Sequence, residues 1–473
     1  MMRYLSTKLL CLTIFIELCC SSDLDANVII IGAGMAGISA AQRLQEGGIN
    51  DILILEGSDK VGGRVASVEF GGVTVSLGAT WIQGIDPAHP ELHPTYQIAQ
   101  RCGGLRGLYQ NYTSLITYDS YGKQNQQPMR WKEFREALSK TEKTGKDLLP
   151  EDKCCEKNVR DELNASGWTP VTPVDKWVDW FSIDYFQGCT SENLSLCLLP
   201  TDLTDSRFIS DGGEETDYFV TDPNGYVKIM KCMADEIEGK KQTRMVFNAV
   251  VTKIDWSRDD YVCVTATVSG QANQFCSKHA ISTVSVGVLK SGSIQFIPEL
   301  PKWKGEVIQR FKLGTYIHIM LEFSEVFWTK HEQIGYIDTK RAYYPLFLNL
   351  REIFPERPKV LIAELTGENA KRAVYQDKAV TIAEIEAILR KMYPTSNVTV
   401  VNSMISDWID NPMIRGSFLY LSVEQNYNDY WLLAAQVGNL YFSGEATSAD
   451  FPGYVHGAHF AGIRTAETIM RLN

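Results

Sequence analysis

The sequence contains no long apolar run beyond its first 24 residues. No later stretch reaches the roughly 18 consecutive apolar residues that a membrane-spanning helix needs, so we expect no membrane span. Low-complexity tracts and internal repeats are also absent from the sequence. Their absence argues against a solenoid and against a disordered chain.

The chain has fewer basic residues than acidic ones. The chain has 46 Lys and Arg against 57 Asp and Glu, which gives a formal net charge of −11. This balance argues against nucleic acid as a partner and is compatible with a cationic ligand. No cysteine has a histidine at the spacing of a metal site, so we expect no metal.

The composition is otherwise that of a folded globular protein. Of the 473 residues, 44% are hydrophobic and 22% are charged. At roughly 100–200 residues per domain, this length predicts about two hydrophobic cores.

Residues 1–22 have the pattern of a signal peptide. Arg3 and Lys8 supply a positive start, Leu9–Ile16 supply most of an apolar core, and Cys19–Ser22 are small residues suited to cleavage. Glu17 interrupts the core, and an N-terminal anchor is the alternative. We expect a secreted, extracellular protein of unspecified oligomeric state.

Secretion changes the interpretation of the cysteines. Eight of the eleven remain after residue 22, and an even number in an oxidising compartment predicts one or more disulfides of undetermined pairing. The alternative, buried free thiols, suits Cys232 and Cys263. Four Asn-x-Ser/Thr triplets predict N-glycosylation, and they begin at Asn111, Asn164, Asn193 and Asn397.

A glycine pattern follows an apolar segment near the start of the mature chain. Asn27–Ile31 is too short for a helix and predicts a buried parallel strand, followed by a helix over Met35–Glu46. Gly32 would permit the turn between them, Gly34 would let a pyrophosphate approach, and Gly37 would let helix and sheet pack closely. The pattern predicts a dinucleotide on the helix N-terminus.

Two charged side chains extend this site. A second predicted strand, Asp51–Leu55, ends in Glu56, which stands at the distance expected of a carboxylate that binds a ribose diol. Arg64 follows Gly62-Gly63, where a cation could contact phosphate. The alternatives are an ordinary turn and a surface charge.

The two predicted domains are interleaved along the chain. Strands predicted at Val246–Trp256, Tyr261–Val268 and Ala280–Val284, and a strand, glycine-rich turn and helix over Leu440–Asn473, join the nucleotide-binding domain. We therefore assign residues 24–98, 208–300 and 420–473 to a Rossmann-like α/β domain. Residues 99–207 and 301–419 are assigned to an α+β substrate domain.

The sequence resembles the flavin amine oxidases, and especially the plant-type extracellular polyamine oxidases. The resemblance runs from Val28 to the C-terminus. The motifs that carry it are Gly32–Gly37, Leu53-Ile54-Leu55-Glu56, Gly62-Gly63-Arg64, Leu77-Gly78-Ala79-Thr80-Trp81, Val284–Lys290 and Gly444–Gly457. It implies the amine oxidase fold and FAD. It also implies FAD held without a covalent bond, because no cysteine occurs in Arg415–Tyr420 or Phe442–Gly457.

The resemblance also implies site residues. Glu445 would lie on the ribityl side of the flavin, the backbone at Val455 would meet the polar edge of its ring, and Phe418 with Tyr454 would clamp an amine before it. Core packing is the alternative for either ring. The full set of implied cofactor residues is Gly32, Gly34, Ala36, Gly37, Glu56, Arg64, Ala79, Trp81, Val251, Glu445, Tyr454 and Val455.

The sequence departs from the family at three positions. His318 stands where a lysine is expected to hold a water at flavin N5, and strand alternation places Tyr316 and Met320 on the same face. A satisfied core histidine is the alternative. Gln83 and Phe186 replace acidic tunnel residues, which would weaken polyamine binding unless Asp184, Glu192 or the acidic segment 211–217 compensates.

We therefore expect an FAD-dependent oxidase of a small amine, of the spermine and spermidine class, that uses O₂. His318, Tyr454, Phe418, Tyr316 and Gln83 are its candidate catalytic residues. The alternatives are an oxidase of another amine or of an amino acid, and an FAD-binding homologue with little or no turnover. An amino-acid oxidase would need a cation for the carboxylate, and the sequence does not place Arg101, Arg130 or Lys176 near the flavin. An NAD-dependent dehydrogenase would leave the C-terminal motif unexplained.

Overall fold

A computed structural model describes residues 25–149, 153–197, 208, 210, 216–238 and 242–472. The predicted signal peptide and the acidic residues 211–215 lie outside the described residues. Among the described residues, no helix combines the length and apolar character that crossing a membrane requires.

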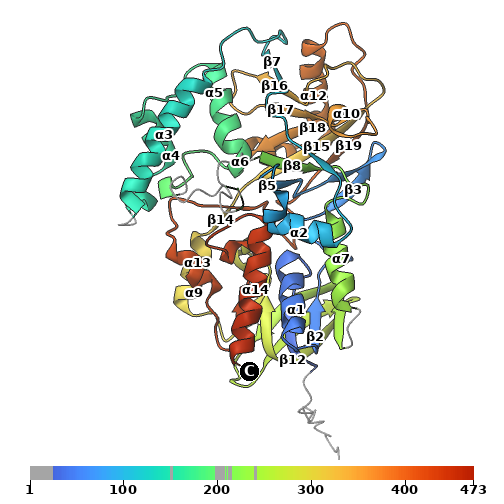
Figure 1. The fold of residues 1–473 in the computed structure, drawn as a ribbon, viewed down its shortest axis with the longest axis vertical. Helices are drawn as coiled ribbons and strands as arrows, with labels where there is room; N and C mark the ends of the chain where they lie inside the picture. Colours follow the sequence, from blue (N-terminus) through green and yellow to red (C-terminus); the bar gives the residue numbers. More distant parts are fainter. Residues whose placement is uncertain are drawn as a thin grey trace, which may run out of the picture.

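The larger of two main sheets is mixed (Figure 1). Its centre is parallel, because β1 runs alongside β2 on one side and β12 on the other, with β9 and β21 parallel beyond them. An antiparallel hairpin of β11 and β12 extends it towards β10. In order, its strands are β13 (Gln295–Ile297), β10 (Ala249–Asp255), β11 (Val262–Val268), β12 (Gln271–Ser282), β1 (Ala26–Ile31), β2 (Ile52–Leu55) and β9 (Thr243–Val246), and β21 (Leu440–Phe442) pairs with β12.

Helix α1 (Met35–Glu46) packs between α14 (Val455–Leu472) and α7 (Val227–Glu238), as Figure 1 shows. The approach of α1 and α14 is close, because a Cβ on Gly462 would lie 2.2 Å from the Ala36 carbonyl oxygen. Glycine in α14 therefore fixes the C-terminal helix against the first helix of the chain.

The second main sheet has six strands and a hydrophobic cluster on each face. Alternate residues of its strands belong to opposite clusters: Met320 packs with α3, α4 and α5, and Ile319 packs with α11 and α12. Its strands are β19 (Val400–Ile405), β15 (Tyr316–Phe323), β18 (Val360–Thr366), β17 (Leu346–Asn349), β16 (Gln333–Ile337) and β7 (Leu115–Asp119). The helices are α3 (Trp131–Leu148), α4 (Val159–Ala165), α5 (Pro173–Asp179), α11 (Gly367–Tyr375) and α12 (Lys378–Met392).

Short elements connect the two sheets. They include a three-stranded sheet in the order β5 (Trp81–Ile85), β8 (Thr216–Val220) and β6 (Gly107–Tyr109), and the pairs β3 (Ser67–Phe70) with β4 (Val73–Ser76) and β14 (Lys312–Leu313) with β20 (Leu419–Tyr420). The remaining α-helices are α2 (Pro94–Arg101), α6 (Tyr185–Gln187), α8 (Val286–Lys290), α9 (Lys302–Arg310), α10 (Leu350–Ile353) and α13 (Asn428–Ala434). One turn of π-helix, Trp180–Asp184, joins α5 to α6.

The observed architecture confirms the predicted fold class. Helix α1 has the predicted bounds, whereas two predicted strands were wrong at their starts. The chain turns at Asn248, where φ is +52°, so β10 begins after Val246. Strand β12 begins nine residues before the predicted Ala280, because it first pairs with β11.

Three disulfides confirm the predicted oxidised cysteines. They join Cys102 to Cys232, Cys155 to Cys197 and Cys263 to Cys276. The alternative of free thiols at Cys232 and Cys263 was wrong, because a helix or a strand can present a half-cystine to a neighbouring segment: Cys263 and Cys276 are cross-strand partners in the β11–β12 hairpin. Cys189 is free and buried.

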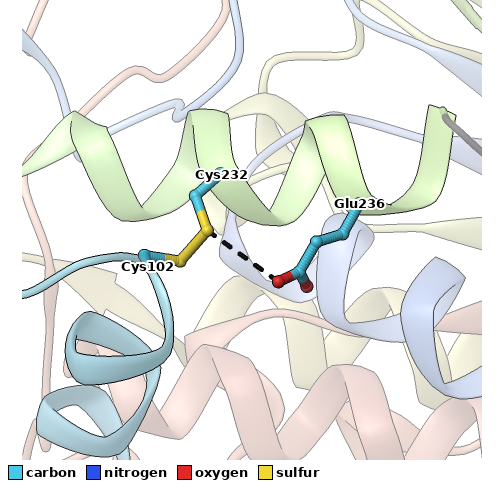
Figure 2. A group of neighbouring side chains, drawn as sticks. All are labelled: Cys102, Cys232 and Glu236. Atoms are coloured by element: carbon cyan, nitrogen blue, oxygen red, sulfur yellow. Dashed lines mark hydrogen bonds between the residues drawn. A yellow bond between two sulfur atoms is a disulfide. The ribbon is translucent and has the colours of Figure 1, made fainter.

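One disulfide lies beside a carboxylate in a group that resembles a metal site (Figure 2). Cys102 follows α2, and Cys232 and Glu236 lie one turn apart on α7, with Glu236 Oε1 3.9 Å from Cys232 Sγ. Because the sulfurs are bonded to each other, neither is a thiolate that could bind a cation. The group is a covalent link between α2 and α7.

Candidate functional site

A cavity of about 480 Å³ opens at the carboxyl ends of β1 and β2 and continues to β15 of the second sheet. Of the candidate residues, only Gly37 does not line it. Those that do are Gly32, Gly34, Ala36, Glu56, Arg64, Ala79, Trp81, Gln83, Val251, Tyr316, His318, Phe418, Glu445, Tyr454 and Val455. The structure therefore brings together residues from both ends of the chain.

The glycines shape the turn between β1 and α1. Gly32 has φ of +108°, which favours glycine, and a Cβ on Gly37 would lie 2.0 Å from the Gly32 carbonyl oxygen. A Cβ on Gly34 would meet no protein atom within 4 Å. Gly34 thus borders open space at the uncapped N-terminus of α1, where backbone N–H groups suit an anion.

Glu56 is held in place by the turns around it. Its Oε2 accepts a hydrogen bond from the Ala33 N–H at 2.7 Å, and its Oε1 accepts from the Ser58 N–H at 2.9 Å and the Ser58 hydroxyl at 2.7 Å. A carboxylate has about four acceptor positions, so the fixed group keeps capacity for a ribose hydroxyl.

Arg64 and Glu445 form a bidentate ion pair. Nη1 donates to Oε1 at 2.7 Å and Nη2 to Oε2 at 2.6 Å, and Nη1 also donates to the Ser417 carbonyl at 2.9 Å. The Glu445 side chain is 7% exposed and that of Arg64 is 25% exposed. The two side chains offset each other's charge, and their pair joins the Gly62-Gly63-Arg64 motif to the C-terminal Gly444–Gly457 motif.

A continuous series of aromatic contacts forms one wall of the cavity. The Tyr185 ring lies 5.1 Å from Phe186 and 6.1 Å from Tyr316, whose ring lies 6.0 Å from Phe418. Tyr454 stacks on His456 at 5.0 Å and lines the same cavity. These rings give this end of the cavity flat apolar surfaces, on which an amine can be oriented.

His318 is almost fully buried at this wall, 5.6 Å from the Tyr316 ring. Its Nδ1 lies 3.3 Å from the Ser76 carbonyl oxygen and its Nε2 lies 3.4 Å from a Glu364 carboxyl oxygen. Desolvation lowers the pKa of His318 to about 4, against the opposing effect of the Ser76 carbonyl. Nδ1 therefore has a hydrogen-bond partner and Nε2 faces a carboxyl oxygen, and the role of His318 at an N5 water stays a prediction.

The structure distinguishes the acidic residues that could replace Gln83 and Phe186. Asp184 is buried beside Arg341, which donates to both its oxygens, and Glu192 is a surface partner of Arg160. Asp217 of β8, by contrast, lines the cavity and accepts a hydrogen bond from the Tyr112 hydroxyl at 2.5 Å. Asp217 is therefore the carboxylate placed to meet a cation there.

Comparison with known proteins identifies the architecture. Residues 35–470 match the family described as flavin containing amine oxidoreductase. The chain belongs to this family. Two plant enzymes are each 32% identical to this amine oxidoreductase: Polyamine oxidase 1 of Zea mays, over 95% of this chain and 91% of its own length, and Polyamine oxidase 7 of Oryza sativa subsp. japonica, over 92% and 93%. The fold matches a solved structure of wild-type putrescine oxidase bound to putrescine with a TM-score of 0.74, at 18% identity over 94% of this chain and 99% of that chain.

The cofactor of this amine oxidoreductase is FAD. The fit is seen in the open space at Gly34, the fixed carboxylate of Glu56 and the uncapped start of α1. These groups suit a pyrophosphate and a ribose, and bound FAD supplies the redox chemistry of amine oxidation. No cysteine is among the described residues that line the cavity, and the non-covalent attachment of the flavin stays a prediction.

Sequence reasoning missed several residues of the oxidoreductase site. Tyr112 and Tyr185 extend the aromatic wall, and Ser417 fixes Arg64 through its carbonyl. Glu364 was missed although a sequence signal existed: it is the one charged residue in the apolar run Val360–Leu365. A carboxyl in such a run is a candidate for burial beside a partner.

Proposed function

We propose that this amine oxidoreductase oxidises a polyamine of the spermine and spermidine class. Bound FAD would supply the acceptor, at N5, for a hydride from the carbon next to nitrogen, and water would hydrolyse the resulting imine to an aldehyde and an amine. O₂ would take up the two electrons together with two protons and leave as H₂O₂. The proposal is supported by the names of the plant relatives and by one feature of this chain, the Asp217 carboxylate at the aromatic end of the cavity.

The surroundings of Asp217 suit a protonated nitrogen. Its partner Tyr112 has its ring 6.1 Å from Phe186, so the carboxylate borders the same aromatic wall as the candidate catalytic residues. An ammonium group there gains a carboxylate and nearby ring faces. A polyamine has a charged nitrogen at a distance from the reacting one. Asp217 would bind the charged nitrogen, and oxidation would occur at the carbon next to the other nitrogen.

The remaining wall residues would orient the reacting nitrogen. Phe418, Tyr316 and Tyr454 present rings to the cavity and exclude water from it. A dry, uncharged environment favours the neutral amine, the form from which a hydride can leave. Gln83 can donate or accept a hydrogen bond without adding a charge.

An amino acid is a poorer substrate for this cavity. Of the described Lys and Arg residues, Arg64 and Arg415 line it, and Arg64 is already paired with Glu445. Arg101, Arg130 and Lys176 are not part of its lining. The cavity therefore offers the Asp217 carboxylate to an amine, and among its described Lys and Arg residues Arg415 is the one that is not paired with Glu445.

We also infer that the enzyme is secreted and glycosylated. The pattern of residues 1–22, the three disulfides and the four sequon asparagines support this inference. All four asparagines, Asn111, Asn164, Asn193 and Asn397, are exposed. Enzymatic removal of N-glycans from the secreted protein should lower its apparent mass, and an unchanged mass would contradict glycosylation.

Asp217→Asn tests the proposed substrate class. Loss of one charge-assisted contact of about 1.5–3 kcal/mol predicts a KM for spermidine raised roughly tenfold or more, with kcat little changed. Benzylamine, which has no second nitrogen, should be oxidised with unchanged KM. Peroxide release measures both substrates.

Tyr112→Phe is the matched control, because it removes the hydrogen bond to Asp217 and keeps the carboxylate. We expect a smaller rise in the KM for spermidine than for Asp217→Asn. Equal KM values in the parent and in Asp217→Asn would contradict recognition of a distal ammonium. Absence of peroxide with every amine would contradict the proposed oxidation and favour an FAD-binding homologue with little turnover.

A further inference from the structure

Glu364 and His318 are direct partners in the antiparallel pairing of β15 with β18. Both are buried, with Glu364 fully inaccessible and His318 3% exposed. A carboxyl in such a place is costly unless it is neutral or well partnered. His318 forms part of the cavity wall, whereas Glu364 behind it has no role in the proposed function.

The contacts of His318 fix where its proton lies. The Ser76 carbonyl oxygen, 3.3 Å from Nδ1, can only accept, so Nδ1 must carry a hydrogen. In a neutral ring Nε2 is then an acceptor, and its partner must donate. The atom that faces Nε2, at 3.4 Å, is a carboxyl oxygen of Glu364.

The surroundings of Glu364 favour the protonated carboxyl. The Tyr316 hydroxyl approaches this carboxyl group, but among the described residues no N–H or O–H group makes a well-aligned hydrogen bond to either of its oxygens. An ionised carboxylate would keep most of its acceptor sites unsatisfied in a dry site, whereas a carboxylic acid needs one acceptor for its hydrogen. Desolvation, opposed by the nearby Tyr316 hydroxyl, raises the pKa of Glu364 to about 8.

We propose that Glu364 is a positioning residue that acts through His318: it is a neutral carboxylic acid that donates to Nε2, fixes the ring against the Ser76 carbonyl and keeps it uncharged. The cavity wall behind Tyr316 then carries no positive charge, which suits a cavity whose ligand is an ammonium. This consequence rests on the proposed function, but the proton on Glu364 does not.

The groups around Glu364 leave its titration distinct. His318 and Tyr316 face it from β15 and Tyr185 from α6, while Leu346 pairs with it from β17. Burial raises the pKa of both tyrosines, so they stay neutral at pH 8. Folding stability linked to Glu364, whose folded pKa is raised, is present below about pH 4.5 and lost by about pH 8. His318, with a lowered pKa, contributes the opposite change between about pH 6.5 and 4.

Infrared spectroscopy of the holoprotein tests the proton on Glu364. At pH 7 the parent should show a buried carboxylic-acid carbonyl band that is absent from Glu364→Gln and disappears with a midpoint near pH 8. Between pH 6.5 and 8 the unfolding temperature of the parent should fall more than that of Glu364→Gln. A parent spectrum at pH 7 identical to that of Glu364→Gln would overturn the proposal.

A second pair of variants tests the positioning role. Gln can donate an N–H to Nε2 as the acid does, whereas Glu364→Leu cannot. The rate of flavin reduction by spermidine at pH 7 should therefore fall about tenfold or more in Glu364→Leu and less than about threefold in Glu364→Gln. Equal losses in the two variants would overturn the role.

The His318→Gln variant covers the case in which Glu364→Gln does not fold. In His318→Gln the acid band should persist with a shifted frequency, because its hydrogen-bond acceptor has changed. An unshifted band would place the acid on a different partner and overturn the pair. If no variant and no parent sample is reduced by any amine, the proposed function fails while the infrared result still decides the state of Glu364.

Discussion

At the scale of single residues, the site depends on charges that neutralise one another. Arg64 was predicted to contact phosphate and Glu445 to lie by the ribityl chain, and the structure joins the two in a bidentate pair. Because Glu445 is buried, its charge is tolerable only with that partner. Arg64 therefore stabilises the fold by pairing with Glu445, whether or not it also contacts FAD.

Replacement of Arg64 by methionine tests this stabilisation. Breaking a buried pair costs about 3–5 kcal/mol, and the quarter exposure of the Arg64 side chain reduces the expected loss of unfolding free energy to about 2–4 kcal/mol. Urea unfolding measures it. The double variant Arg64→Met with Glu445→Leu should recover part of the loss, and a double variant as unstable as the sum of the two single variants would contradict coupling.

At the scale of elements, the β1–α1 turn separates a structural glycine from a cofactor glycine. Gly37 lets α1 lie against the turn, because any Cβ there would overlap the Gly32 carbonyl. Gly34 has an ordinary φ of −81° and open space beside it. The same short motif therefore serves both the fold and the ligand.

Alanine at each glycine should separate these two effects. Gly37→Ala should lower the unfolding temperature even without FAD, because helix and turn must move apart. Gly34→Ala should leave the unfolding temperature of the apoprotein unchanged and weaken FAD binding, since its methyl group fills the space next to the α1 N-terminus. Thermal unfolding and fluorescence titration with FAD measure both. FAD affinity unchanged in Gly34→Ala would contradict the placement of the pyrophosphate.

The nucleotide-binding half of the site was predictable from sequence, because a tight strand-to-helix turn requires glycines at fixed positions within one short segment. The bounds of α1 and the glycine turn were predicted from this spacing. The partners of Arg64 and His318 did not, because Glu445 and Glu364 are distant in sequence and are chosen by sheet register and packing. Asp217 was named only as the end of an acidic segment, since its side-chain direction depends on the pairing of β8.

At the scale of the whole molecule, one disulfide joins segments that are distant along the chain. Cys102 and Cys232 are 130 residues apart, and their bond ties α2 to α7, which packs on α1 beneath the cofactor end of the cavity. A bond of this span limits the unfolded chain more than a short loop would. We expect it to stabilise the arrangement around the dinucleotide site.

Replacing both Cys102 and Cys232 by serine should lower the free energy of unfolding by about 2–5 kcal/mol. Guanidinium unfolding measures the change, and zinc should restore none of it because the group is not a metal site. The matched control is Glu236→Gln, which keeps the disulfide and should change stability little. A stability equal to that of the parent in the double variant would contradict a stabilising bond.

The proposed amine oxidation can be tested by mixing the purified yellow protein anaerobically with spermine or spermidine and then admitting air. We expect the visible flavin absorbance to bleach on mixing and to recover when O₂ is admitted, with one H₂O₂ formed for each amine oxidised. A yellow protein that no amine bleaches would contradict it.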